Sequence, residues 1–167
     1  MLHNLSVLVT RPAETSETLA SALRVVNALP VVIPMIEIIG ISNESIGLIK
    51  KDFDCAVFVS KNAVRFGLPV AHESGISLQS KTIFAIGPRT AQALEDAGLK
   101  HPITPDKIYN SEGLIDSSAF KEVVSNKQRV LVFRATKGRE LLASTLRETG
   151  CKVDYCECYI RQISEER

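Results

Sequence analysis

Hydroxyl and cationic side chains follow four apolar segments of this 167-residue sequence, each where the segment gives way to a helical pattern. In a parallel sheet such points share one edge, outside the carboxyl ends of the strands, where open α/β sheets bind ligands. Helix N-termini there present unpaired N–H groups and partial positive charge. We therefore predict a site for a ligand with several carboxylates or phosphates. Its candidate residues are Thr10, Arg11, Ser60, Lys61, Asn62, Gly87, Thr90, Ser111, Arg134, Lys137 and Arg139, with Arg89 adding charge.

An ordinary explanation stays open for each of these residues taken singly. Charges on loops are usually solvated, and hydroxyls such as those of Ser60 and Ser111 are favoured as helix N-caps. It is their joint placement at one edge of a sheet that favours a ligand site.

The sequence lacks the residues that several other kinds of active site require. The phosphate loops G-x-x-x-x-G-K-[ST] and G-x-G-x-x-G are absent, and the strand ends offer no carboxylate pair, Ser-His-Asp set or Cys-His set. Cys156 and Cys158 form a C-x-C pair without the second pair of a zinc site, so we interpret them as packed thiols. We predict no metal and no cofactor. An enzyme of this kind would act by holding a reactive substrate in a productive shape.

Alternating patterns define the elements that must position these residues. Period-2 or apolar runs predict strands, and amphipathic runs predict helices; their alternation indicates βα units and a parallel sheet covered by helices. Gly87-Pro88 starts one helix and Gly98 ends it. The predicted strands are 5–10, 31–38, 54–59, 82–86, about 101–104, 129–134 and 152–159, and the predicted helices are 14–26, 43–50, 61–67, 88–97, 111–125 (with a possible break) and 138–148.

One strand–helix unit occurs twice. VLVTRPAETSETLASALR at 7–24 and VLVFRATKGRELLASTLR at 130–147 share ten of eighteen positions without a gap, including Arg11 and Arg134. Any βα unit can produce part of this match. A true duplication predicts one complete domain over the middle of the chain and an incomplete strand–helix–strand part of a second, similar domain, whose remainder would follow residue 167.

Composition limits the partners. A net charge of +1 gives no electrostatic case for nucleic acid, and no apolar run approaches the ~18 residues that span a bilayer. The first apolar run is too short for a signal peptide. We expect a cytoplasmic protein that binds neither nucleic acid nor membrane.

Six segments in order resemble the uroporphyrinogen-III synthase family. They are VLVTRP at 7–12, PMIEI at 34–38, DCAVFVSKNAV at 54–64, IFAIGPRTAQALEDAGL at 83–99, NSEGL at 110–114 and VLVFRATKGRELLASTLRETGCKVDYCECYIR at 130–161. Asn27, where the family usually has Gly, and Ala135, where the family often has Gly after the Arg, depart from its pattern.

The resemblance implies two flavodoxin-like α/β domains joined by a two-strand connector. On this basis 1–36 open a split domain, 37–39 belong to the connector, 40–158 form a complete inserted domain and 159–167 begin the return connector. The first domain is then incomplete in this chain. Its amphipathic helix, with Leu19, Leu23 and Val26 on one stripe, needs a partner. We therefore expect residues 1–36 to be disordered, to dock on the inserted domain or to self-associate with another chain, whereas the full-length form is expected to be a monomer.

The resemblance also implies a reaction. The family cyclises hydroxymethylbilane, an octacarboxylate, to uroporphyrinogen III with loss of water and inversion of ring D, without metal or cofactor. Tyr159 matches the tyrosine proposed to assist departure of the hydroxyl, and Ser60 and Thr90 match polar residues of the cleft. A half-buried strand aromatic is the ordinary interpretation of Tyr159. The alternative to an enzyme is a non-catalytic flavodoxin-like ligand-binding or interaction module.

Overall fold

The computed structural model describes residues 3–41 and 52–164. The chain divides into two compact units: unit 1 comprises Met1–Ile39 with Arg161–Arg167, and unit 2 comprises Gly40–Ile160. The helix predicted over 43–50 lies outside the described residues. Within the described part of the chain, no helix is both long and apolar enough to cross a bilayer.

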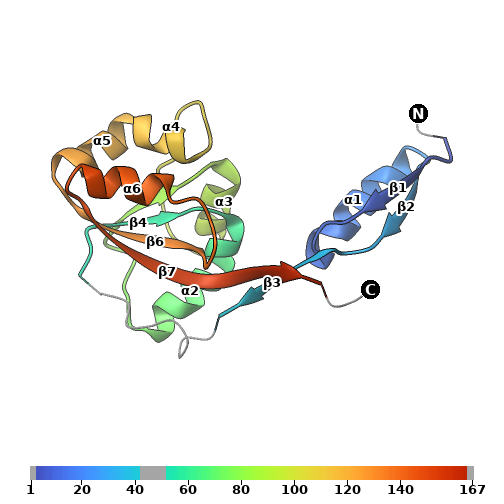
Figure 1. Cartoon of the computed structure of the whole chain (residues 1–167), viewed down its shortest axis with the longest axis horizontal. Coiled ribbons are helices and arrows are strands. Elements are labelled where there is room, and N and C mark those ends of the chain that lie inside the picture. Colours follow the sequence, from blue (N-terminus) through green and yellow to red (C-terminus); the bar gives the residue numbers. More distant parts are fainter. Residues whose placement is uncertain (1–2, 42–51, 165–167) are drawn as a thin grey trace. The chain divides into compact units, whose positions relative to one another are not determined.

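Unit 2 is a mixed α/β structure with a mainly parallel sheet flanked by helices (Figure 1). The sheet order is β3-β7-β6-β4-β5, and β7, β6, β4 and β5 are mutually parallel. β3 runs antiparallel to β7, because Ile41 N donates to Cys158 O while Ser164 N donates to Met35 O. The elements are β4 (Cys55–Phe58), α2 (Lys61–Glu73), β5 (Thr82–Ala85), α3 (Pro88–Asp96), α4 (Ser111–Asp116), α5 (Ser118–Ser125), β6 (Arg129–Ala135), α6 (Leu141–Glu148) and β7 (Lys152–Ile163). β3 (Ile36–Gly40) lies in unit 1 up to Ile39, as does β7 from Arg161 onward.

Helices cover both faces of this sheet, so its central strands are apolar throughout. α4, α5 and α6 cover one face, where Phe84 meets Phe120 edge to face at 5.0 Å and Leu114 and Leu146 are fully buried. On the other face the rings of Phe58 and Phe133 stack at 4.3 Å, and α2 packs against β6. β4 and β6 are buried along nearly their whole length. This core fixes the strand ends at which the candidate residues lie.

Unit 1 contains a two-stranded parallel sheet and one helix. The elements are β1 (Ser6–Val9), α1 (Ala13–Val25) and β2 (Leu29–Val32). The helix buries Ser16 and Ala20, whereas the predicted stripe of Leu19, Leu23 and Val26 is only half-buried or exposed.

The two copies of the sequence repeat form the same βαβ unit. Ser6 pairs with Leu29 in β1–β2, and Arg129 pairs with Lys152 in β6–β7. Adding the repeat offset of 123 residues (130 − 7) to both members of the first pair gives the second pair. The match therefore extends from sequence to strand register.

Two predicted strands are wrong in part, and proline is the cause in both. The segment 31–38 is divided between β2 and β3, which belong to different sheets, with Pro34 between them. The segment 101–104 makes only an isolated bridge from Ile103 to Phe84. Pro102 and Pro105, on either side, cannot donate to a ladder.

Several helix ends follow the predictions, but the helix predicted over 61–67 continues through Pro69 to Glu73, and the helix predicted from 138 begins at Leu141. Ser60 caps α2 by accepting from Ala63 N at 3.0 Å, and Pro88 is the first residue of α3. Gly98 follows α3 with a left-handed φ of +87°. The break within 111–125 is confirmed between α4 and α5. The cap predicted at Ser111 is wrong: Asn110 is the N-cap of α4 and accepts from Gly113 N at 2.8 Å.

Candidate functional site

The candidate residues of unit 2 share the carboxyl end of its parallel strands. In the register of the sheet, Phe58 of β4 stands between Ala85 of β5 and Phe133 of β6. Each of these strand ends is followed by predicted site residues. The three groups are Ser60, Lys61 and Asn62 after β4, Gly87 and Thr90 after β5, and Arg134, Lys137 and Arg139 at the end of β6.

Tyr159 and Ser60 are brought together by the sheet, although 99 residues separate them. Their hydroxyl oxygens lie 3.0 Å apart. β7 is bulged against β6 at this point, and Tyr159 O accepts from Thr136 N. Tyr159 is only 1% exposed, so its phenol faces the start of α2 and not solvent. The half-buried position that the ordinary interpretation predicts is wrong, because Tyr159 lies fully inside unit 2.

Gly87 and Thr90 lie where α3 begins. Gly87 is buried and extended, and a Cβ placed on it would come within 3.0 Å of Tyr109 Cβ. Its lack of a side chain therefore lets the loop that carries Tyr109 cover the helix start. Thr90 is buried one turn into α3. Tyr109 is 54% exposed and adds an aromatic surface to this edge that the sequence did not indicate.

Ser111 and Arg139 meet the same edge from α4 and from the loop after β6. Ser111 is half-buried as the first residue of α4. Arg139 lies 3.7 Å from Glu112, and both side chains are largely exposed. An exposed pair of this kind contributes little stability and leaves the guanidinium accessible. Lys61 and Lys137 are exposed, and neither has an ion pair within the described residues.

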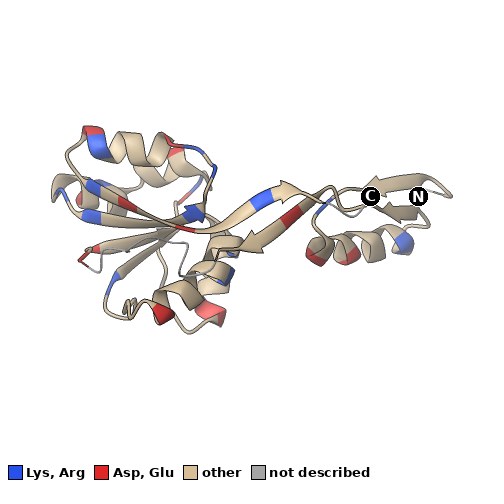
Figure 2. Cartoon of the chain, turned by 60° about the horizontal axis from the view of Figure 1, so that its bottom comes forward, with Lys and Arg blue, Asp and Glu red and all other residues tan. Residues whose placement is uncertain are grey.

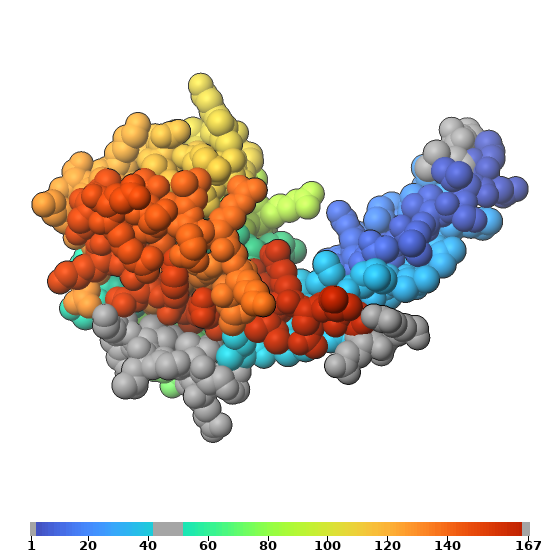
Figure 3. Space-filling view, in the orientation of Figure 1, coloured from blue at the N-terminus to red at the C-terminus, as the bar shows by residue number. Residues whose placement is uncertain are grey.

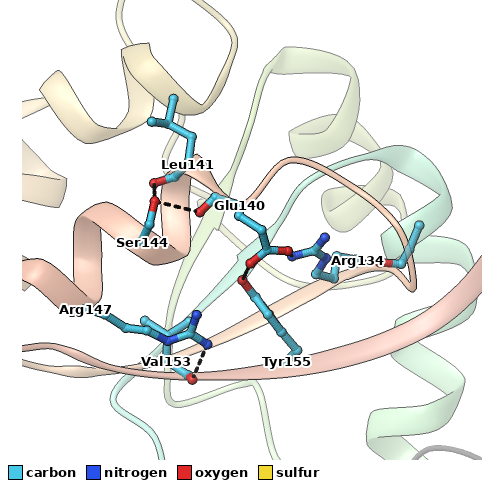
Figure 4. Close-up of polar contacts among 8 residues, drawn as sticks. Arg134, Glu140, Leu141, Ser144, Arg147, Val153 and Tyr155 are labelled. Atoms are coloured by element: carbon cyan, nitrogen blue, oxygen red, sulfur yellow. Dashed lines mark hydrogen bonds and ion pairs between the residues drawn. The ribbon is translucent and has the colours of Figure 1, made fainter.

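Arg134 differs from the other cations because it is buried and paired within the chain. Its side chain is 6% exposed, and Nη1 donates to Glu140 Oε1 at 2.6 Å (Figure 4). Nε donates to Ala135 O, and the guanidinium lies 4.4 Å from the centre of the Tyr155 ring. Tyr155 OH completes the cluster by donating to Glu140 Oε2 at 2.5 Å. The charge of Arg134 is thus balanced internally, and its contact with a ligand stays a prediction.

The cluster shifts the pKa values of Glu140 and Tyr155 in opposite directions. The hydrogen bonds from Tyr155 and then Arg134 hold the pKa of Glu140 below its ordinary value. Burial, and then donation to Glu140, raises the pKa of Tyr155. Because Glu140 is the N-cap residue of α6, these contacts fix the loop 136–140, which carries Lys137 and Arg139. Sequence reasoning missed Glu140 and Tyr155, although Glu140 is one of the ten repeated positions.

Thr10 and Arg11 belong to unit 1 and follow β1. Both side chains are exposed, and their carbonyls accept from Met35 N and from Ser16 Oγ. The contacts given for these two residues are all with other residues of unit 1.

Charges of both signs are spread over unit 2 in Figure 2. Within the described residues, no group of three or more His, Cys, Asp or Glu side chains is arranged to hold a metal ion. The thiols of Cys55, Cys151, Cys156 and Cys158 are buried and unpaired, and burial raises the pKa of Cys55 to about 12. The edge thus offers cations, hydroxyls and helix N-termini and no nucleophilic thiolate.

The family model described as uroporphyrinogen-III synthase HemD matches residues 17–167. The chain belongs to the uroporphyrinogen-III synthase family. Relatives in this family include the enzymes of Salmonella typhimurium, 30% identical over 94% of this chain and 65% of that protein, and of Proteus mirabilis, 30% identical over 97% and 85%. The chain thus spans just under two thirds of the Salmonella protein and of the Escherichia coli one.

Solved structures of the family share the fold. A mutant uroporphyrinogen III synthase of Thermus thermophilus matches with a TM-score of 0.70 at 17% identity, over 96% of this chain and 64% of that one. The Helicobacter pylori protein matches less closely, with a TM-score of 0.51 over 80% of this chain. The mixed α/β architecture with a mainly parallel sheet is therefore that of the family.

Proposed function

We propose that this chain contributes uroporphyrinogen-III synthase activity, a cyclising hydro-lyase step of tetrapyrrole (heme and porphyrin) biosynthesis. The reaction closes hydroxymethylbilane to uroporphyrinogen III with loss of water and inversion of ring D, and it takes place in the cytoplasm without a cofactor. Membership of the family over residues 17–167 carries the proposal. The expected partner is therefore a polycarboxylate small molecule, and no nucleic acid or membrane.

The strand-end edge of unit 2 supports a polycarboxylate substrate. Counted within the unit, β4, β5, β6 and β7 have the spatial order 2-1-3-4, as in the flavodoxin-like order 2-1-3-4-5. Ligands of such sheets bind where the order reverses, which is between β4 and β6. The start of α2 lies at that point with the exposed Lys61, and Lys137 follows β6. Free N–H groups and two cations that have no ion pair with a described residue suit carboxylates.

Tyr159 and Ser60 supply a proton path in this proposal. The Ser60 hydroxyl can accept from Ala63 N and from Tyr159 OH while donating its own proton outward. The substrate hydroxyl takes that proton and leaves as water as its C–O bond breaks, and Tyr159 reprotonates Ser60. The proton lost when the macrocycle closes then returns to the Tyr159 phenolate. Atoms and charge balance over the cycle.

We also propose the split-domain organisation that the resemblance implies. Residues 1–36 open one flavodoxin-like domain, 37–39 and 159–167 are connector, and 40–158 form the inserted domain. The identical register of β1–β2 and β6–β7 supports two related domains. One face of β1–β2 leaves Leu8, Leu29 and Val31 about half exposed. We infer self-association of this chain through 1–36, and a monomer for a form of the relatives' full length; sedimentation of both forms over a range of concentrations tests this.

The decisive experiment measures product isomers. The chain, and any longer product of which it is part, is incubated with hydroxymethylbilane, and the porphyrinogens are oxidised and separated. The proposal expects the type III isomer in excess, whereas the spontaneous product alone, type I, from folded protein of the relatives' full length contradicts it. Binding of uroporphyrinogen III without turnover by that form would favour the non-catalytic module.

Tyr159→Phe tests the proton path. We expect kcat to fall by roughly 10²-fold or more with little change in KM, since general acid assistance is worth about 10²–10⁴-fold. Tyr155→Phe is the comparison variant, because it removes a phenol OH from the same strand but not from Ser60. Since Tyr155 holds the loop that carries Lys137 and Arg139, we expect this variant to raise KM and to leave kcat unchanged. Equal activity of Tyr159→Phe and the unaltered protein would remove Tyr159 from the reaction.

A further inference from the structure

The segment PMIEI at 34–38, for which the proposed reaction has no use, forms part of a pocket within unit 1. The pocket has a volume of about 220 Å³. Its apolar walls include Pro12 at the start of α1 and Pro34, Ile36 and Ile38 on and before β3. Two carboxylates, of Glu14 and Glu37, also line it.

Glu37 is held in place by the strand opposite. In the antiparallel register of β3 and β7, Gln162 stands directly across from Glu37, and Figure 3 shows the red end of β7 beside the cyan β3. Gln162 Nε2 donates to Glu37 Oε2 at 3.4 Å, and Ser164 Oγ donates to Oε1 at 3.2 Å. Ser164 is itself 5% exposed and lines the pocket. The carboxylate is therefore oriented by one donor on each oxygen.

That arrangement leaves Glu37 able to accept more. An ionised carboxylate offers about four lone-pair sites, and among the described residues two side-chain donors fill them. The Glu37 carboxylate repels anions, so the acidic side chains of a polycarboxylate are disfavoured beside it. An N–H donor is favoured.

The size and walls limit the ligand further. Sites for whole drug-sized molecules are usually about 300–1,000 Å³, so this pocket suits a single ring. Proline and isoleucine walls suit a flat, apolar ring face. A five-membered aromatic ring with one N–H satisfies both the walls and the carboxylate.

We propose that this pocket binds one pyrrole ring, with its N–H donated to Glu37. Its assignment to a ring of the tetrapyrrole rests on the proposed function.

Free pyrrole tests the site without any turnover. The ¹⁵N-labelled chain is titrated with pyrrole and with N-methylpyrrole, which has nearly the same shape but no N–H. We expect pyrrole to shift the amide signals of Ile36 to Ile38, and N-methylpyrrole to bind about ten-fold more weakly, because a hydrogen bond to a charged group is lost. Equal binding of the two, or no shift in this segment, would overturn the proposal.

Two variants complete the test. Glu37→Gln keeps the side-chain size and should weaken pyrrole binding about ten-fold. Glu17→Gln removes the same charge from the second turn of α1, outside the pocket, and should bind pyrrole like the unaltered chain. Unchanged binding in a folded Glu37→Gln, or binding of methylammonium in place of pyrrole, contradicts the inference. The isomer analysis can give either result whatever these titrations show. A failure of the proposed function is therefore distinguishable from a failure of this inference.

Discussion

The two copies of the repeat share a register and differ in burial. β6 lies between β7 and β4 and is buried from Val130 to Ala135, whereas β1 pairs with β2 alone among the described strands and buries only Val9. Leu8 is 59% exposed, while its counterpart Leu131 is fully buried. Ten shared positions are thus enough to specify strand, helix and register. The stability of the unit depends on the neighbours that cover it.

The charged positions of the repeat diverge in the same way. Glu140 accepts from the buried Arg134, whereas Glu17 pairs with the exposed Arg24 at 2.6 Å within α1. Arg11, the counterpart of Arg134, is exposed and has no ion pair among the described residues. In the second copy the repeated glutamate thus pairs with a buried arginine, although its own side chain is 59% exposed.

The largest expected difference between the copies is in their helix cores. Leu146 is fully buried and its counterpart Leu23 is half-buried. We expect Leu146→Ala to lower the free energy of unfolding of unit 2 by about 2–5 kcal/mol, and Leu23→Ala to lower that of unit 1 by less than about 1.5 kcal/mol. Native-state hydrogen exchange, read at β6 and β1 amides, measures each unit separately. Equal losses would mean that unit 1 is packed as tightly as unit 2.

The next comparison concerns the two glutamates. We expect Glu140→Ala to destabilise unit 2 by about 1–2 kcal/mol, because it leaves the buried Arg134 without its carboxylate. Glu17→Ala removes an exposed pair and should destabilise unit 1 far less than Glu140→Ala destabilises unit 2. Urea unfolding of both variants provides the test, and a negligible loss in Glu140→Ala would show that Arg134 does not need its partner.

Helix termination offers a smaller contrast. Asn27 and Gly150 are equivalent, and both have left-handed φ, +60° and +90°. A β-carbon is strained there, and Asn is the side chain that tolerates this region best after Gly. We expect alanine at either position to cost about 1 kcal/mol, and Asn27→Gly to stabilise unit 1 by a few tenths of a kcal/mol. A stabilising Gly150→Ala, seen by thermal unfolding, would contradict this.

Much of the structure was predictable because local signals agree with the sheet. The helix starts at Ser60 and Pro88 and the end at Gly98 all follow from capping chemistry that acts within one turn. The apolar residues of 101–104 favour a strand, and the two flanking prolines prevent it from forming more than a bridge. Ser and Asn are equally good caps, so the sequence alone does not choose between Ser111 and its neighbour Asn110.

From the sequence, the candidate site was predictable only as a set of residues that share one edge of a parallel sheet. Strand order brings Ser60 to Tyr159 across 99 residues, and no local pattern contains that contact. The burial of Arg134 follows from its place at the end of a central strand, and its partner Glu140 lies beyond a turn whose path the sequence leaves open. The two hydrogen bonds to Glu37 come from Gln162 and Ser164, so they can be recognised only when β3 is placed beside β7.

The smallest expected effect is the response of the two glutamates to salt. Both pKa values lie below the ordinary 4.5, Glu140 through Tyr155 and Arg134 and Glu17 through Arg24 and Ser21. Each lowered pKa contributes stability that is present above the unfolded-state value and is lost as the pH falls through the folded-state value, so the loss occurs below about pH 4.5.

Salt separates the two carboxyls because only one has a buried partner. At 1 M NaCl the Debye length is about 3 Å, so the exposed pair of Glu17 is screened and the contact of Glu140 with Arg134 is screened much less. Carboxyl ¹³C titration should show the pKa of Glu17 returning toward its ordinary value while that of Glu140 stays low. Tyr155→Phe should raise the pKa of Glu140, since its hydroxyl is the main cause of the shift. Equal salt sensitivity of the two carboxyls would mean that the buried cation does not distinguish the second copy from the first.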